Sequence, residues 1–162
     1  LALHLKPVDF LPLNLSMLQY IVFRLLTSFC GVFGFSIMFN SPVPLAMSAA
    51  IIGAISNTLR LELVDLASLP PAAAAFFAAM IAGLLASAYK KHSGFPRIAI
   101  TVPSIVIMVP GLYLYRAIYN LGMMNLSISA SWFASATLII LALPLGLIFA
   151  RIMTDKMFRY CT

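Results

Sequence analysis

Long runs of apolar residues alternate along this chain with short interruptions that carry charges, prolines or asparagines. No charged residue occurs between Arg24 and Arg60, and only the segment NSPVP at 40–44 interrupts this run. Two prolines beside Asn and Ser favour a tight turn between two helices. Since about 20 residues of helix cross a bilayer, the pattern predicts five spans, near residues 17–39, 44–59, 66–89, 98–119 and 132–150.

Two boundaries depend on local chemistry. Pro70 and Pro71 lie where prolines are tolerated, at the entry of a helix. The uncharged run 117–150 is too long for one span, so its polar portion NLGMMNLSISAS at 120–131 is interpreted as a loop. If the first or the fourth segment only re-enters the membrane, the number of spans drops to four.

Composition agrees with this pattern. Of 162 residues, 63% are hydrophobic and 9% are charged, whereas charged residues make up about 25% of a soluble domain. So few charges cannot cover the surface of a soluble protein of this length. We therefore expect an all-α fold, a polytopic transmembrane helix bundle that forms a single membrane domain over residues 1–162.

The net charge of +6 does not indicate nucleic-acid binding, because the basic residues are scattered mostly at span ends, where they meet lipid headgroups. With five spans, one side of the membrane carries Lys90, Lys91, Arg97, Arg151, Lys156 and Arg159. The other side carries Lys6, Arg60 and Arg116, with Arg24 inside the first span. The positive-inside rule then places the C-terminus in the cytoplasm and the N-terminus outside.

Small residues recur every four positions on two of the spans. They are Ala46, Ala50 and Ala54 on the second span and Ala75, Ala79 and Gly83 on the third. Such spacing lets membrane helices approach closely and predicts packing inside the bundle.

Sequence signatures of enzymes are missing. The chain has no HExxH, GxSxG or glycine-rich phosphate loop, and the four acids Asp9, Glu62, Asp65 and Asp155 fall outside the predicted spans. Cys30 and Cys161 have no neighbouring Cys or His that would indicate a disulfide framework or a metal site. We expect no enzymatic activity, no metal and no cofactor.

The fourth span holds the strongest candidate site. Pro103 and Pro110 lie seven residues apart on nearly one helix face, and Gly111 follows. Each proline removes an N–H and frees the carbonyl four residues back, that of Ala99 or Val106. In lipid these carbonyls need a neighbouring helix, the hydroxyl of Ser104 or Thr101, or water in a cavity. Broken helices of this kind build substrate sites in transporters, although a kink packed against neighbours is the simpler alternative.

Arginines near the outer side add to this candidate. Arg24, Arg60 and Arg116 could converge on a small anionic or zwitterionic solute, because the planar fork of Arg holds carboxylates. Two other roles stay open: the arginines snorkel to headgroups, or Arg60 pairs with Glu62 or Asp65.

Two segments resemble a known family. GFSIMFNSPVPLAMSAAIIGAISNTLR at 34–60 and IAITVPSIVIMVPGLYLYRAIYNLG at 98–122 are similar to the threonine/serine exporter family, specifically to its small membrane subunit. The ordered motifs are an FNxP turn (Phe39, Asn40, Pro42), a G-x₆-R pattern (Gly53, Arg60) and a PxxxxxxPG segment followed by Tyr (Pro103, Pro110, Gly111, Tyr113).

The resemblance implies one half of a two-part secondary exporter in the bacterial inner membrane, with a larger membrane subunit as partner. Threonine and serine, or dicarboxylates such as succinate, would be the solutes. Phe39, Asn40 and Pro42 would form a structural turn. The expected substrate-binding residues are Arg60, Pro103, Ser104, Pro110, Gly111, Tyr113 and Arg116.

Two points stay open. Without a carboxylate inside a predicted span, any proton-coupling acid is expected in the partner. The chain could also be an accessory subunit that does not transport but stabilises a membrane complex, with prolines that serve only as kinks.

Overall fold

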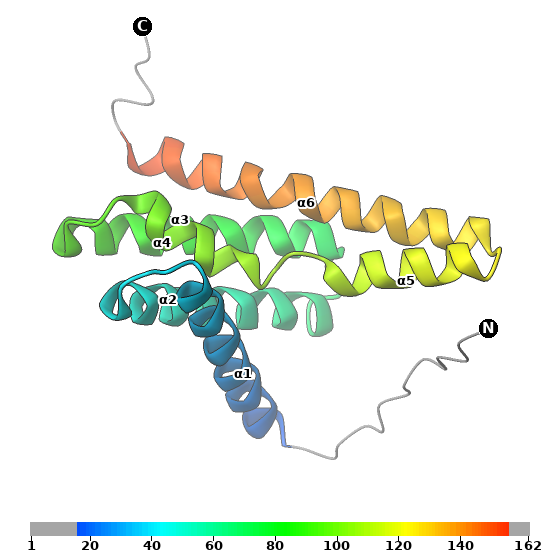
Figure 1. Ribbon diagram of the computed structural model, residues 1–162, viewed down its shortest axis with the longest axis horizontal. Helices are drawn as coiled ribbons and strands as arrows, with labels where there is room; N and C mark the ends of the chain where they lie inside the picture. The colour runs from blue at the N-terminus through cyan, green and yellow to red at the C-terminus, as the bar shows by residue number, and fades with distance from the viewer. Residues whose placement is uncertain (1–15, 156–162) are drawn as a thin grey trace, which may run out of the picture.

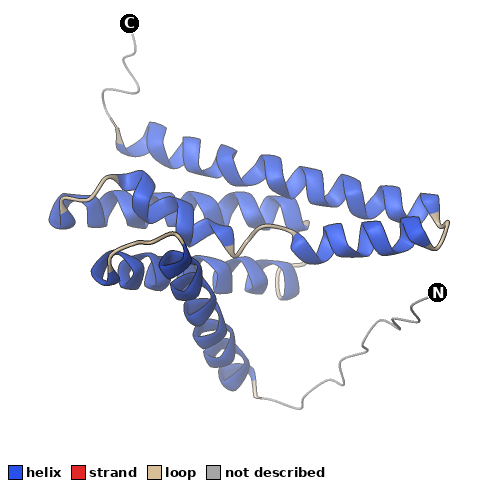
Figure 2. Cartoon of the chain, in the orientation of Figure 1, coloured by secondary structure: helices blue, strands red, loops and turns tan. Residues whose placement is uncertain are grey.

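A computed structural model describes residues 16–155, and six helices make up this part of the chain (Figure 1). They are α1 (Met17–Met38), α2 (Val43–Asp65), α3 (Pro71–Ser93), α4 (Arg97–Val106), α5 (Gly111–Gly122) and α6 (Leu126–Thr154). No strand occurs among these described residues (Figure 2), so the expected all-α fold is confirmed. Four helices are long and apolar enough to cross a membrane, and the bent pair α4–α5 makes a fifth span if it counts as one.

The expected turn between the first two spans is present. Phe39 caps α1, and the backbone N–H of Ser41 donates to the carbonyl of Ser36. Asn40 has a φ of 56°, in the left-handed region that Asn tolerates better than most residues. Pro42 then precedes α2 at its N-cap position. The chain therefore reverses direction at these three residues.

The helices extend beyond two of the predicted segments. α2 continues past residue 59, the predicted end of the second span, to Asp65. The region 120–131 is not one loop, because α5 runs to Gly122 and α6 begins at Leu126. Two of its hydroxyl groups bind helix carbonyls: Ser129 Oγ donates across to the Ala117 carbonyl of α5 at 2.7 Å, and Ser131 Oγ donates to the Ile128 carbonyl of its own helix at 2.7 Å. A serine-rich stretch can therefore continue a helix.

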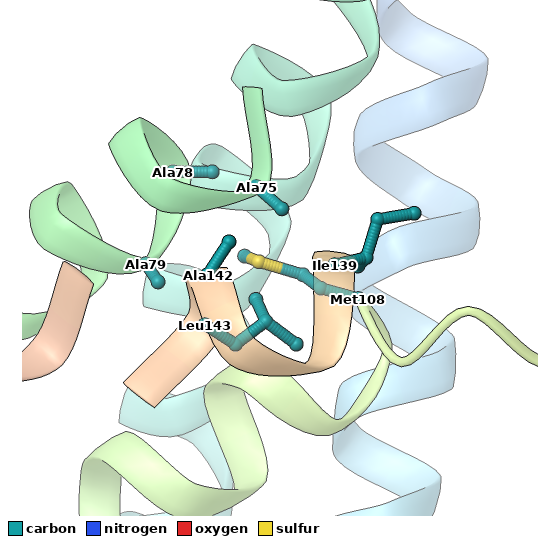
Figure 3. Packing of buried hydrophobic residues seen from close by; sticks show 7 residues of the cluster. All are labelled: Ala75, Ala78, Ala79, Met108, Ile139, Ala142 and Leu143. Carbon is teal, nitrogen blue, oxygen red and sulfur yellow. The ribbon is translucent and has the colours of Figure 1, made fainter. Parts of the chain in front are cut away.

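The expected close packing of small residues is confirmed. All six residues of the two predicted stripes are buried. Figure 3 shows how Ala75, Ala78 and Ala79 of α3 face Ala142 and Leu143 of α6, with Ile139 and Met108 completing the cluster. Small side chains on α3 let α6 come close. The resulting van der Waals contacts hold the two helices together in lipid, where no hydrophobic driving force acts between them.

α3 and α6 run parallel with one constant register. Ala79 lies beside Gly146 and Gly83 beside Ala150, and the hydroxyls of Ser87 and Thr154 are 3.3 Å apart. In each pair the residue numbers differ by 67, so Pro71 at the start of α3 lies level with residue 138 (71 + 67 = 138).

This register leaves the first three turns of α6 without α3 beside them. The 12 residues from 126 to 137 correspond to about 18 Å of helix. Figure 1 shows this part of α6 and α5 extending side by side beyond the ends of α2 and α3. We call α5 with residues 126–137 of α6 the projecting hairpin.

Candidate functional site

The fourth span is broken at residues 107–110. The axes of α4 and α5 differ by 43°. The break closes on its own backbone: Met108 N–H donates to the Ile105 carbonyl at 2.9 Å, and Val109 N–H donates to the Val106 carbonyl at 3.1 Å. The carbonyl of Val106, which Pro110 frees, therefore has a backbone partner and does not need a hydroxyl or water.

Pro103 and Ser104 lie in α4, away from the break, and both are buried. Ser104 Oγ is 2.7 Å from the Ile100 carbonyl and 3.0 Å from the Ala49 carbonyl of α2, and it donates to both. The Thr101 hydroxyl donates to the Arg97 carbonyl at 3.1 Å. These hydroxyls thus bind carbonyls other than that of Ala99, and Ser104 attaches α4 to α2.

Gly53 of α2 lies against α4 one turn beyond this bond. A Cβ at this position would be 2.9 Å from the Ser104 carbonyl oxygen and 2.7 Å from Val32 Cγ2 of α1. Glycine, which has no Cβ, therefore fits at this position of α2 between α1 and α4. The glycine of the G-x₆-R pattern is therefore explained by close packing of α1, α2 and α4.

We predict that Gly53→Ala weakens this packing by about 1–3 kcal/mol, as overpacking usually does. The readout is the temperature at which the purified protein loses its monodisperse elution profile in detergent. Gly34→Ala is the matched control, because nothing lies within 4 Å of a Cβ at that helical position. Equal transition temperatures for the two variants would contradict the prediction.

Arg60 reaches the break from α2. Its Nη1 donates to the Met108 carbonyl at 2.9 Å. Arg60 also lines a cavity of about 230 Å³ between the C-terminal end of α2, the first residues of α3 and α5, and the middle of α6. The lining residues are Arg60, Leu61, Val64, Pro71, Val109, Pro110, Gly111, Leu112, Tyr113 and Ile139. Four of the seven predicted site residues, Arg60, Pro110, Gly111 and Tyr113, thus line one cavity.

The electrostatics of this cavity favour an anion. α5 begins at Gly111 inside it, and no side chain caps its N-terminus in the described chain. The first N–H groups of a helix carry partial positive charge and bind carboxylates or phosphates. The Arg60 guanidinium adds a full positive charge on the same side, with a planar fork suited to a carboxylate.

Arg116 lies in the projecting hairpin rather than in the cavity lining. Its guanidinium carbon is 4.9 Å from the centre of the Trp132 ring of α6, a cation–π contact. Trp132 also meets Tyr113 edge-on, with ring centres 5.5 Å apart. Trp132 thus connects Arg116 to Tyr113, which lines the cavity.

Arg24 occupies a different place from the one expected. It forms ion pairs with Glu62 at 2.9 Å and with Asp65, and it stacks on Tyr20 at 4.0 Å. Its side chain is 13% exposed and is covered by these three partners. The two carboxylates pair with Arg24 and not with Arg60, and the three arginines do not share one cavity.

These ion pairs show where two of the four acids lie. Glu62 and Asp65, which were expected outside the spans, are in the last turn of α2, beyond residue 59 where the predicted second span ends. The pairs join residues 38 and 41 positions apart, and no local pattern reveals such a distance. The one available signal was the presence of a charged residue, Arg24, inside an apolar span.

Comparisons with known proteins agree with these features. The profile of the family "Threonine/Serine exporter, ThrE" matches residues 24–153, from the first turns of α1 to the end of α6. This match extends the resemblance beyond residues 34–122. An uncharacterized protein of Haemophilus influenzae is 31% identical over 133 residues, covering 73% of this chain. The matched segment is 44% of that relative.

A comparison with solved structures finds no match. The family profile, however, covers most of the chain, including the turn at Asn40, the Gly53 and Arg60 positions and the broken helix. The chain therefore belongs to the threonine/serine exporter family.

Proposed function

We propose that this chain is one part of a secondary exporter for small amino or carboxylic acids, with threonine, serine or a dicarboxylate such as succinate as the solute. One observation carries the proposal: the Arg60 guanidinium and the start of α5 line the same small cavity at a break in a membrane helix. Broken helices whose N-terminal ends meet an anionic group are a recurring form of solute site in transporters.

The solute carboxylate binds between Arg60 and the N–H groups that follow Gly111 in the first turn of α5, because the Gly111 N–H itself donates to the Val109 carbonyl at 2.8 Å. Gly111 keeps this helix start free of a side chain, and Tyr113 lines the cavity with a side chain that carries a hydroxyl group. Pro110 sets the break, while Pro103 and Ser104 position α4 against α2. Arg116 positions Tyr113 through Trp132. A cavity of about 230 Å³ suits a solute smaller than a drug-sized ligand.

A larger membrane subunit completes the transport route in this proposal. Leu112 and Tyr113 at the base of the projecting hairpin line the cavity, and the hairpin extends beyond α2 and α3 (Figure 1), where a partner can pack against it. The match to less than half of the Haemophilus influenzae protein is consistent with a chain that supplies part of a larger unit.

We place the protein in a bacterial inner membrane with its C-terminus inside and its N-terminus outside. In the described chain Lys90, Arg97 and Arg151 lie at one end of the bundle, while Arg24, Arg60 and Arg116 lie toward the other. Lys6, Lys156 and Arg159, which also entered the charge count, fall outside the described residues.

Efflux measurements test the proposal. The chain is expressed with and without the larger membrane subunit, and export of labelled threonine, serine and succinate is followed. We expect efflux of at least one of these solutes only when both chains are present. Efflux from liposomes that contain this chain alone would contradict the two-part arrangement. A lack of efflux for the whole panel with both chains at normal abundance would contradict the exporter proposal.

A further inference from the structure

Two cavities of about 510 Å³ each flank Arg97 at the end of the bundle opposite Arg60. One lies between α3 and α6, and the other lies between α4 and α6. Lys90, Arg97 and Asp155 line both cavities, so the two spaces share one charged rim.

The α4–α6 cavity carries an excess of positive charge. Among the described residues, Lys90, Arg97 and Arg151 line it together with the Asp155 carboxylate, so basic side chains outnumber acidic ones there. Arg151 Nε is 3.6 Å from Asp155 Oδ2. α4 begins at Arg97, so the positive end of its helix dipole adds to the charge of this rim.

Arg97 is held in place rather than free to leave the rim. Its Nη2 donates to the Gly83 carbonyl at 3.0 Å, and its Nη1 donates to Thr154 Oγ1 at 3.0 Å. These bonds connect α3, α4 and α6 at one point. The guanidinium therefore stays between the two cavities, where an incoming anion meets a positioned charge.

An apolar groove continues from this rim along α4 and α6. Ile98 and Val102 of α4 and Leu147 and Ile148 of α6 line it. Ile98 is 68% exposed and Ile148 is 45% exposed. α6 is a candidate membrane span and α4 is half of the bent pair, so we expect this groove to face hydrocarbon, with the charged rim at the ends of the helices.

We propose that the α4–α6 cavity binds a phospholipid with an anionic headgroup. The headgroup phosphate lies at Lys90, Arg97 and Arg151, and an acyl chain follows Ile98, Val102 and Ile148. Basic pockets between membrane helices recognise anionic lipids in this way. A small soluble anion would use only the rim, and a neutral lipid would bring no net negative charge to a rim in which basic side chains predominate. This site is independent of the solute cavity at Arg60.

Native mass spectrometry of the detergent-purified protein tests the proposal. Phosphatidylglycerol and phosphatidylcholine with identical acyl chains are added in equal amounts, and the ratio of the two bound lipids is measured. We expect a clear preference for phosphatidylglycerol. Because each basic residue contributes roughly a fivefold preference, the double variant Lys90→Gln, Arg151→Gln should lose it by about 25-fold. Arg97 stays unchanged, since it also holds three helices together.

Two matched variants separate the elements of the site. Arg116→Gln removes one positive charge at the other end of the molecule and should keep the lipid preference. Val102→Trp fills the groove without changing the charge and should lower retention of phosphatidylglycerol. Equal retention of both lipids by the wild type, an unchanged preference in the double variant, or displacement of the lipid by excess inorganic phosphate would each overturn the proposal.

Discussion

Replacing Arg60 with alanine is expected to lower solute efflux by about 10- to 100-fold. Hydrogen bonds to charged groups contribute about 1.5–3 kcal/mol, and about 1.4 kcal/mol corresponds to a tenfold change. The variant loses the cation that faces the start of α5. It also loses the hydrogen bond from Arg60 Nη1 to the Met108 carbonyl, which is 2.9 Å long in the intact protein. Efflux of labelled threonine, from cells that also contain the larger subunit, measures the effect.

Arg60→Lys separates charge from geometry. Lysine keeps the positive charge but is a single point donor, whereas the arginine fork can bind the Met108 carbonyl and a carboxylate together. We therefore expect intermediate efflux for the lysine variant. Arg116→Gln should reduce efflux less than Arg60→Ala, because Arg116 contacts Trp132 and does not line the cavity.

Protein abundance decides between the two functional hypotheses. Normal efflux by Arg60→Ala at normal abundance would favour the accessory role, in which the prolines are only kinks. Reduced efflux at normal abundance would support the solute site. Measuring the amount of this chain and of its partner in the membrane therefore belongs to the same experiment.

Gly146→Ala should be the most destabilising small substitution in the helix bundle. A Cβ at this position would lie 2.4 Å from the Phe76 carbonyl oxygen and 3.0 Å from the Met80 nitrogen, both backbone atoms of α3. Backbone cannot move aside like a flexible side chain, so α3 and α6 must separate. Overpacking of this kind costs about 1–3 kcal/mol, which lowers the unfolding temperature of a chain of this size by roughly 2–10 °C.

Gly122→Ala is the matched control for this second prediction. Nothing lies within 4 Å of a Cβ at Gly122, so its unfolding temperature in detergent should stay close to that of the wild type. If the Gly146 and Gly122 variants unfold at the same temperature, the close contact between α3 and α6 is not a stabilising feature of the bundle.

The sequence predicted those parts of the fold that depend on local chemistry. Charge-free runs located the spans, and the segment NSPVP located the turn at Asn40. The proline and glycine at 110–111 located the break. The serine-rich stretch after residue 120 was misjudged because serine hydroxyls that bond to helix carbonyls make such a stretch compatible with a helix.

The candidate site was only partly predictable, because its assembly depends on register between distant segments. Arg60 and Gly111 share a cavity through the packing of α2 against α4. Arg24 and Arg116 looked equivalent to Arg60 in sequence, but Glu62 and Asp65 bind one and Trp132 binds the other. Such partners lie far apart along the chain, where composition and periodicity carry no information.

Because of the projecting hairpin, the helices of this molecule differ in length along the bundle. α2 and α3 have 23 residues each and α6 has 29, which correspond to about 34 Å and 43 Å. A hydrocarbon core about 30 Å thick matches the shorter helices, so thin bilayers leave the hairpin outside hydrocarbon and thick ones draw it in. Because Leu112 and Tyr113 at the base of the hairpin line the Arg60 cavity, we expect membrane thickness to affect solute binding in that cavity.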